Sequence, residues 1–251
     1  MSVRVIRIGP VLCGEWDYGG TQVIVDRRFH GPDGSGNGGY VAGRLAGRVP
    51  IDTVTVTLRQ PPPLETELVV TVEDERGHSV RLWDGERLIA EAIAGAIVVP
   101  PIAPVPFERA LEAAEKYRAA ENHPFPGCFV CGLDREPGDG LRLEPGPVAD
   151  GTVAAPWVPE QVPERELVWA ALDCPGGWSF DIAGRPAVLG TMTAQVMDVP
   201  EAGEQCVVTG FARSREGRKM HAATALYGAD GRLLGRAEQI WIEVDPAAFG
   251  R

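Results

Sequence analysis

The sequence repeats a set of landmarks at a constant spacing, and this repeat limits the folds that the chain can adopt. The glycine pair Gly38 and Gly39, an alternating apolar run at 54–58 and Pro62 each have a counterpart 138 positions later. These counterparts are Gly176 and Gly177, residues 192–196 and Pro200. An Asp-Gly pair, typical of a tight hairpin turn, stands at 84–85 and again at 230–231, with a spacing of 146. We therefore expect two similar halves, related as the subunits of a symmetric homodimer are.

Each half has the pattern of one helix packed against a curled antiparallel sheet. A glycine pair opens an apolar helical stretch, and a long strand, a proline-containing connection and further strands follow. Residues 54–58 and 68–72 alternate between apolar and polar side chains, as half-buried strands do. The expected fold class is α+β.

A proline-rich and glycine-rich segment separates the halves. Four prolines at 100–106 form a stiff connection, and apolar residues at helical spacing predict a helix over 107–121. Residues 123–147 are rich in Gly, Pro and Cys. We predict an N-terminal domain at 1–106, a connector at 107–150 and a C-terminal domain at 151–251.

Composition excludes several classes of partner. The 251 residues include 35 acidic and 24 basic side chains, a net charge of −11 that repels nucleic acid and anionic lipid. No apolar run reaches the roughly 18 residues of a membrane span, and residues 1–10 lack the apolar core of a secretory signal. We therefore expect a cytoplasmic protein. Its five cysteines are odd in number and sparse, which indicates mainly reduced thiols.

Asp173 is the strongest candidate for a catalytic residue. It ends an apolar run and precedes Gly176 and Gly177, which we expect to open the second-half helix. In that place a general base would lie beside free backbone N–H groups that could bind an oxyanion. The alternative is that Asp173 only caps the helix, as Ser35 could in the first half. The glycine pairs likewise leave two interpretations open: close approach of a substrate, or close packing of the helix.

Cys128 and Cys131 have the two-residue spacing of a zinc knuckle, and His123 lies nearby in the sequence. Structural zinc needs four ligands, and no second pair with this spacing is present. We therefore expect a packed pair of thiols and no metal. Motifs for phosphate binding, dinucleotide binding and a serine nucleophile are absent.

With these motifs, the chain resembles the double-hotdog acyl-CoA thioesterases, in particular the thioesterase II type. Residues 37–45 (NGGYVAGRL) resemble the opening of the family's first-half helix, although Tyr40 stands where the family usually has Gln. Residues 171–173 resemble its catalytic aspartate segment, and residues 230–239 resemble a closing strand that ends at a catalytic glutamine. The family's Asp-His dipeptide is missing, and the Cys-rich connector is foreign to it, which suggests a separate branch.

The resemblance implies a double-hotdog fold and hydrolysis of an acyl-CoA, or of another acyl-thioester, by water. Asp173 would be the base, and Gln239 with Thr191 or Thr193 would orient the water. The resemblance and the glycine motifs together give the substrate and oxyanion candidates: Gly176, Gly177, Asn37, Gly38 and Gly39. No metal or cofactor is expected beyond the coenzyme A of the substrate, and a homodimer of double hotdogs is left open.

Two other functions remain open at this point. A non-catalytic protein that binds acyl-CoA or a lipid thioester would keep the groove without the base. A hotdog hydratase acting on enoyl-CoA would need an Asp and His pair near the opening of the helix, where only His30 and Asp33 stand.

Overall fold

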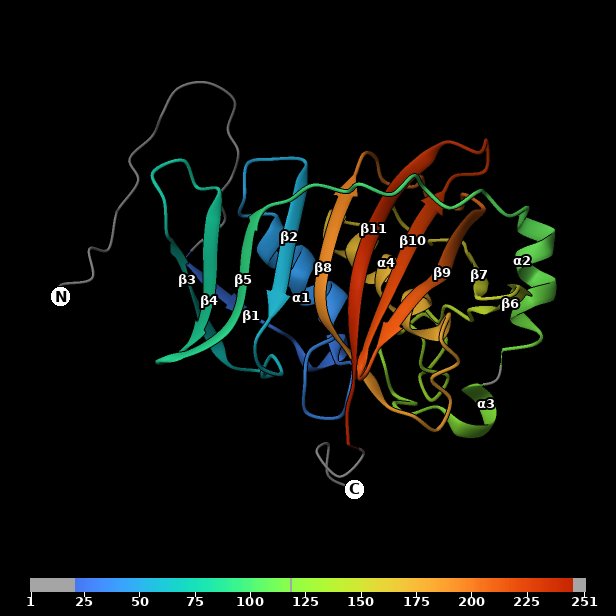
Figure 1. Cartoon of the computed structure of the whole chain (residues 1–251), viewed down its shortest axis with the longest axis horizontal. Helices are drawn as coiled ribbons and strands as arrows, with labels where there is room; N and C mark the ends of the chain where they lie inside the picture. Colours follow the sequence, from blue (N-terminus) through green and yellow to red (C-terminus); the bar gives the residue numbers. More distant parts are fainter. Residues whose placement is uncertain (1–20, 118, 246–251) are drawn as a thin grey trace.

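The protein forms one antiparallel sheet with helices on one face (Figure 1). The structure is a computed structural model and describes residues 21–117 and 119–245. Within these residues the sheet has 11 strands in the order β1-β3-β4-β5-β2-β8-β11-β10-β9-β7-β6. In that order the strands are β1 (Gln22–Ile24), β3 (Glu67–Val72), β4 (Ser79–Asp84), β5 (Arg87–Ala94), β2 (Thr53–Leu58), β8 (Ala187–Val196), β11 (Leu233–Glu243), β10 (Lys219–Tyr227), β9 (Cys206–Glu216), β7 (Thr152–Trp157) and β6 (Gly146–Ala149).

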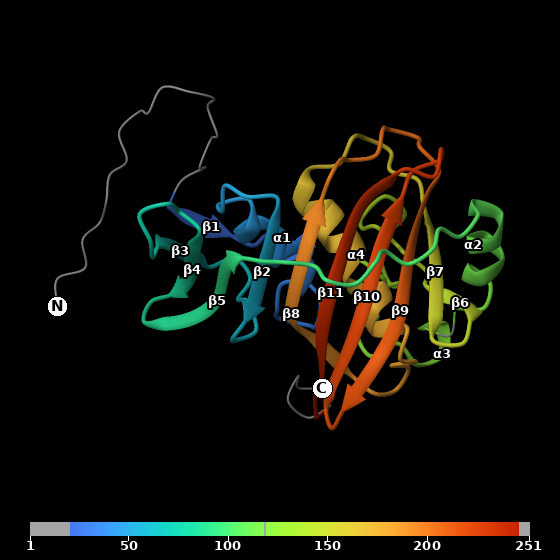
Figure 2. The same cartoon turned by 45° about the horizontal axis from the view of Figure 1, so that its top comes forward.

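Two helices, α1 (Gly38–Ala46) and α4 (Arg165–Trp178), lie side by side against the concave face of the sheet. Helix α1 packs on β2, and α4 packs on the strands from β8 to β9. The shorter helices α2 (Phe107–Ala114) and α3 (Ala119–Asn122) lie at the β6 end of the sheet, as Figure 2 also shows. A single 3-10 turn, η1 (Arg27–Phe29), precedes α1.

Strands β2 and β8 join the two parts of the sheet at its centre. Val54 pairs with Ala194 and Val56 with Met192, and all four side chains are buried beneath the helices. On one side of this seam β5, β4 and β3 form consecutive hairpins, and on the other side β11, β10 and β9 do. The strands predicted at 54–58, 68–72 and 192–196 are confirmed. So are the hairpin turns, where Gly85 and Gly231 take the positive φ angles of 58° and 80° that glycine adopts without strain.

The prediction that Gly176 and Gly177 open the second-half helix is wrong. Helix α4 begins at Arg165, so this glycine pair lies in its last turn, whereas Gly38 and Gly39 do open α1. The equal spacing of the two pairs therefore does not mark equivalent positions. The physical reason is burial: residues 168–178 are all buried, so the helix lacks the polar face that would reveal its period.

The helix predicted over 107–121 is also shorter than expected. Helix α2 ends at Ala114, and α3 is a separate turn of four residues. The connector is part of the core, since Phe129, Val130 and Leu143 are buried in the same apolar cluster as α1 and α4. Strand β6, inside the predicted connector, pairs with β7 beyond it.

The segment that follows β5 crosses the face of the sheet opposite to the helices (Figure 1). The backbone N–H groups of Val98 and Val99 donate to the carboxylate of Glu238 on β11. These contacts mark the face of β11, and of its neighbour β8, that points away from the helices. None of the helices in the described ranges has the length and apolar character needed to span a lipid bilayer.

Candidate functional site

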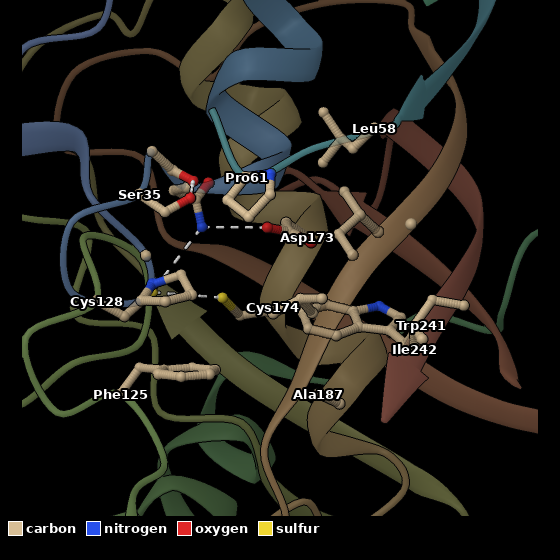
Figure 3. A pocket seen from close by; sticks show the side chains of 18 of the residues that line it. Ser35, Leu58, Pro61, Phe125, Cys128, Asp173, Cys174, Ala187, Trp241 and Ile242 are labelled. Carbon is tan, nitrogen blue, oxygen red and sulfur yellow. Dashed lines mark hydrogen bonds between the residues drawn. The ribbon is translucent and has the colours of Figure 1, made fainter. Parts of the chain in front are cut away.

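A cavity of about 220 Å³ opens where the N-terminus of α1, the last turns of α4, the connector and the ends of β8 and β11 meet. Figure 3 shows this pocket, with Asp173 and Cys174 projecting from α4 and the sulfur of Cys174 directed at Cys128 of the connector. Its walls are mainly apolar and include Leu58, Phe125, Trp178, Ile182, Leu189 and Trp241. Such a cavity suits an apolar group with one polar reacting end.

The carboxylate of Asp173 joins α4 to the start of α1. One of its oxygens, Oδ2, accepts hydrogen bonds from the backbone N–H of Gly39 at 2.9 Å and from the side-chain amide of Asn37 at 3.1 Å. The carbonyl oxygen of the Asn37 side chain accepts from the N–H of Tyr40 at 2.9 Å, which caps α1. Three of the residues predicted for the site, Asn37, Gly39 and Asp173, are therefore in direct contact.

The second oxygen of Asp173, Oδ1, is buried and has no hydrogen-bond partner among the described residues. Asp173 is 1% exposed and lines the pocket. Burial raises the pKa of Asp173 to about 7, although the hydrogen bond from Gly39 opposes the shift. A carboxyl with this pKa and one unpaired oxygen can exchange a proton with a molecule in the pocket near neutral pH.

The N-terminus of α1 supplies the free donors that were expected from α4. The N–H of Gly38 lies at the first position of α1, lines the pocket and has no acceptor within 21–117 and 119–245. The partial positive charge of a helix N-terminus favours an oxyanion at such a position. The interpretation that Asp173 caps the second-half helix is wrong, because Asp173 lies inside α4. Its carboxylate instead accepts a hydrogen bond from the N–H of Gly39 in the first turn of α1.

Close packing of the two helices brings these groups together. A Cβ added at Gly39 would lie 2.4 Å from the Cβ of Asp173, and one at Gly43 would lie 2.7 Å from the Cα of Glu166. The two glycines are one helical turn apart on the face of α1 that meets α4. For Gly39 the structure therefore favours packing over substrate approach.

Gly176 and Gly177 are not placed to bind an oxyanion. In the last turn of a helix, backbone N–H groups point toward the preceding turn and the free groups are carbonyls. A Cβ at Gly176 would meet the Oε1 of Gln239 at 1.7 Å, and one at Gly177 would meet the Trp241 ring at 3.0 Å. These glycines let β11 approach α4.

Gln239 is buried beneath α4 and does not contact the carboxylate of Asp173. Its amide donates to the backbone carbonyls of Leu172 at 2.6 Å and Asp173 at 3.2 Å, and its Oε1 accepts from the indole N–H of Trp241 at 2.9 Å. Both ends of the side chain are occupied. Gln239 therefore supports the backbone on which Asp173 stands.

Thr191 and Thr193 lie on the opposite face of the sheet from Asp173, so the prediction that one of them orients water at this carboxylate is corrected. Thr193 pairs across strands with Glu238, whose carboxylate holds the outer segment at 98–99, and Thr191 is two residues away on the same face. The hydroxyl of Thr193 bonds that of Thr55 at 2.8 Å. Met192, between the two threonines, is the residue of this group that faces the helices.

Cys174 also belongs to the site, although the sequence did not indicate it. The sulfur atoms of Cys128, Cys131 and Cys174 lie within 4.8 Å of one another, and all three residues line the pocket. The four cysteines of the described ranges are free thiols, and Cys13 lies outside these ranges. Interaction with the adjacent thiols of Cys131 and Cys174 holds the pKa of Cys128 well below the usual value, while burial raises the pKa of the other two.

His123 lines the pocket but has no free ring nitrogen. Its Nδ1 accepts from the N–H of Phe125 at 2.9 Å, and its Nε2 lies 3.2 Å from the carbonyl oxygen of Cys131. Burial lowers its pKa, which keeps the ring neutral. His30 contacts the carbonyl oxygen of its neighbour Gly31, and Asp33 is exposed, so these two residues do not form an acid–base pair.

No protein-family model and no curated protein matches this chain. Solved structures do match it. A conserved protein of unknown function with a hotdog fold from Alicyclobacillus acidocaldarius is 14% identical, and the match covers 90% of this chain and 93% of that one, with a TM-score of 0.57. This chain has a hotdog fold.

Two further matching structures carry names that refer to a thioesterase or to TesB. The acyl-CoA thioesterase II TesB2 from Mycobacterium marinum is 13% identical, with 90% of this chain and 93% of that one covered and a TM-score of 0.54. A TesB protein from Mycobacterium avium subsp. paratuberculosis is 13% identical, with 84% and 88% covered and a TM-score of 0.53. The hotdog fold expected from the sequence is confirmed by these matches, and the chemistry has to be argued from the site.

Proposed function

We propose that this protein is a double hotdog that hydrolyses an acyl-thioester, with acyl-CoA as the substrate class, by means of a water molecule activated by Asp173. One observation carries the proposal: Asp173, whose Oδ1 is unpaired, and Gly38, whose N–H has no acceptor among the described residues, line the same apolar pocket. A base and an oxyanion donor on one pocket are the two groups that attack by water on a thioester requires. The names of the TesB structures support the same reaction class.

In this mechanism the acyl chain occupies the apolar part of the pocket, and the thioester carbonyl points at the N-terminus of α1. Asp173 takes a proton from water as the water oxygen bonds to the carbonyl carbon. The N–H of Gly38 stabilises the negative charge that forms on the carbonyl oxygen. The C–S bond then breaks, and the leaving thiolate receives the proton from Asp173. A thiol with a pKa of about 8.5 leaves readily, so neither a metal nor a cofactor is needed for the chemistry.

Asn37 and Gln239 are positioning residues in this proposal. Asn37 donates to Oδ2 of Asp173 and leaves Oδ1 unpaired, and it also caps the helix that presents Gly38. Gln239 holds the α4 backbone at Leu172 and Asp173. Thr191 and Thr193 have no part in it, because they lie on the other face of the sheet.

The two alternatives from the sequence are weaker. A hydratase would need a second acid–base group beside Asp173, and both ring nitrogens of His123 in the pocket are occupied by backbone groups. A binding protein without catalysis would have no use for a buried carboxylate with one unpaired oxygen, which is costly to keep in an apolar pocket.

We propose the cytoplasm as the location and a soluble small-molecule thioester as the partner.

The experiment that tests the proposal is a turnover screen of short-chain, medium-chain, long-chain and aryl acyl-CoAs, with the released thiol detected. We expect hydrolysis of at least one class and its loss in the Asp173→Asn variant. Tight binding of an acyl-CoA without thiol release would select the binding protein instead.

A further inference from the structure

The three thiols beside the pocket come from two parts of the chain that the fold brings together. Cys128 and Cys131 lie in the connector, and Cys174 follows Asp173 on α4. Figure 3 shows Cys174 directed at Cys128, and their sulfur atoms are 3.9 Å apart. All three residues are buried, at 3–4% exposure. A cluster of three thiols is more than packing requires, because a small apolar side chain would fill each of these positions equally well.

The sulfur spacing fits a metal ion better than a disulfide. A disulfide joins two sulfurs at about 2.05 Å and would leave the third thiol unused. In a tetrahedral zinc site with Zn–S bonds of about 2.3 Å, the ligand sulfurs lie about 3.8 Å apart. The observed 3.9 Å between Cys128 and Cys174 matches this edge, and Cys131 lies within 4.8 Å of both.

The connector loop is held in a shape that turns both of its sulfurs to the same side. The N–H of Gly132 donates to the carbonyl of Cys128 at 2.9 Å, and a Cβ at Gly132 would lie 2.4 Å from the carbonyl oxygen of Pro126. The carbonyl of Cys131 accepts from the hydroxyl of Tyr117 at 3.0 Å. A loop fixed by these contacts does not have to be ordered when a ligand binds.

Two buried hydrogen-bond donors belong to residues that line the pocket with the cluster, and thiolate ligands accept such bonds. The amide of Asn37 donates to the sulfur of Cys128 at 3.9 Å. The indole N–H of Trp178 is buried, at 5% exposure of the residue, and has no hydrogen-bond acceptor among the described residues. Trp178 lines the same pocket as the three cysteines.

We propose that Cys128, Cys131 and Cys174 bind one Zn²⁺ ion as thiolates, with the fourth position open to the pocket. Soft thiolate ligands select zinc and related thiophilic ions over magnesium or calcium. His123 is not the fourth ligand, because both of its nitrogens are occupied. All three cysteines line the cavity, so a water molecule from the pocket can complete the tetrahedron. The thiol protons are released to solvent as the zinc–sulfur bonds form.

In this proposal the ion ties the connector to α4 beside Asp173 and takes no part in the hydrolysis. The proposal replaces the expectation that no metal binds. That expectation counted only two cysteines and His123 as candidate ligands, because nothing in the spacing of the sequence places Cys174 beside them. The proposal does not depend on the proposed function, since it is tested by metal binding alone.

The test uses the full chain, reduced, freed of metal with a chelator and titrated with Zn²⁺ and separately with Co²⁺. We expect one equivalent of Zn²⁺ to bind. We also expect Co²⁺ to produce the sulfur-to-cobalt charge-transfer bands and intense visible bands of a tetrahedral thiolate site. Cys128→Ser, Cys131→Ser and Cys174→Ser should each weaken Zn²⁺ binding by more than about a hundredfold. Cys206→Ser is the matched control, because Cys206 is also a buried free thiol but lies on β9 outside the cluster, and it should bind as the wild type does.

A wild-type Co²⁺ spectrum without thiolate charge-transfer bands overturns the proposal, whatever the variants do. So does stoichiometric Zn²⁺ binding that survives in all three serine variants. If a serine variant fails to fold by circular dichroism, the wild-type Co²⁺ spectrum still decides. The thermal midpoint of the wild type should also rise with added Zn²⁺, and that of Cys206→Ser should rise equally.

Discussion

The carboxylate of Asp173, near the end of α4, accepts a hydrogen bond from the backbone N–H of Gly39 in the first turn of α1. The two residues are 134 positions apart in the sequence. This bond fixes one oxygen of the carboxylate on a helix N-terminus. The other oxygen has no hydrogen-bond partner among the described residues, and Asp173 lines the pocket. The catalytic proposal and the packing of the two helices therefore depend on the same contact.

Replacing Asp173 by Asn should remove turnover with little loss of stability. The amide oxygen of Asn can still accept from Gly39, but the side chain cannot take a proton from water. We expect kcat to fall by roughly 10²- to 10⁴-fold and the free energy of unfolding to change by less than about 1 kcal/mol. Steady-state kinetics and denaturant unfolding measure the two quantities. Glu166→Gln is the control, because Glu166 is a half-buried carboxyl on the same helix that does not line the pocket, and it should keep activity within about threefold. Full activity in Asp173→Asn would reduce Asp173 to a structural residue.

Replacing Thr193 by Val should leave the reaction unchanged. The side chain lies on the outer face of β8, and its hydroxyl bonds Thr55. We expect kcat/KM within about threefold of the wild type, together with a loss of about 1 kcal/mol of stability from the lost hydrogen bond. Thr191→Val should behave in the same way toward substrate. A fall in kcat/KM of a hundredfold in either folded variant would restore the water-orienting role implied by the resemblance.

Replacing Gly39 by Ala should destabilise the protein through the contact between α1 and α4. The new methyl group would lie 2.4 Å from the Cβ of Asp173 and 2.8 Å from the carbonyl oxygen of Trp169. We expect a loss of about 1–3 kcal/mol or more in the free energy of unfolding, measured with urea. Gly47→Ala, at the other end of the same helix, is the control. Its nearest contact is 3.6 Å away and its φ is −61°, so it should change stability by less than about 0.5 kcal/mol. Equal effects of the two substitutions would contradict the close helix contact.

Replacing Gln239 by Met should lower both stability and turnover. The substitution removes the donors to the carbonyls of Leu172 and Asp173 and leaves the indole N–H of Trp241 without its acceptor. We expect a loss of about 1–3 kcal/mol in the free energy of unfolding, and a lower kcat because Asp173 is less firmly placed. Gln195→Met is the control. Gln195 lies on β8 and accepts from Arg236 in a half-exposed position, so it should lose less than about 1 kcal/mol. An unchanged kcat in Gln239→Met would show that this side chain supports the fold alone.

The sequence by itself determined three of the strands, at 54–58, 68–72 and 192–196, and two of the hairpin turns. The alternation of Val and Thr over 54–58 predicts a strand with one buried face, and this strand is β2. The Asp-Gly pairs at 84–85 and 230–231 predict hairpins, because glycine adopts the positive φ that such turns need. Both signals are local: they depend on neighbouring side chains and on the backbone, so a single sequence carries them.

The tertiary structure alone decided where α4 begins and what its residues contact. An apolar helix buried on all sides has no polar stripe, so its start at Arg165 is not readable from period, and Asp173 was expected ahead of a helix instead of inside one. The partner of Asp173 on α1 and the meeting of Cys174 with Cys128 follow from the crossing of two helices and the folding of the connector onto them. Contacts of this range depend on which buried faces pack together, a property of the whole core that no local spacing in the sequence encodes.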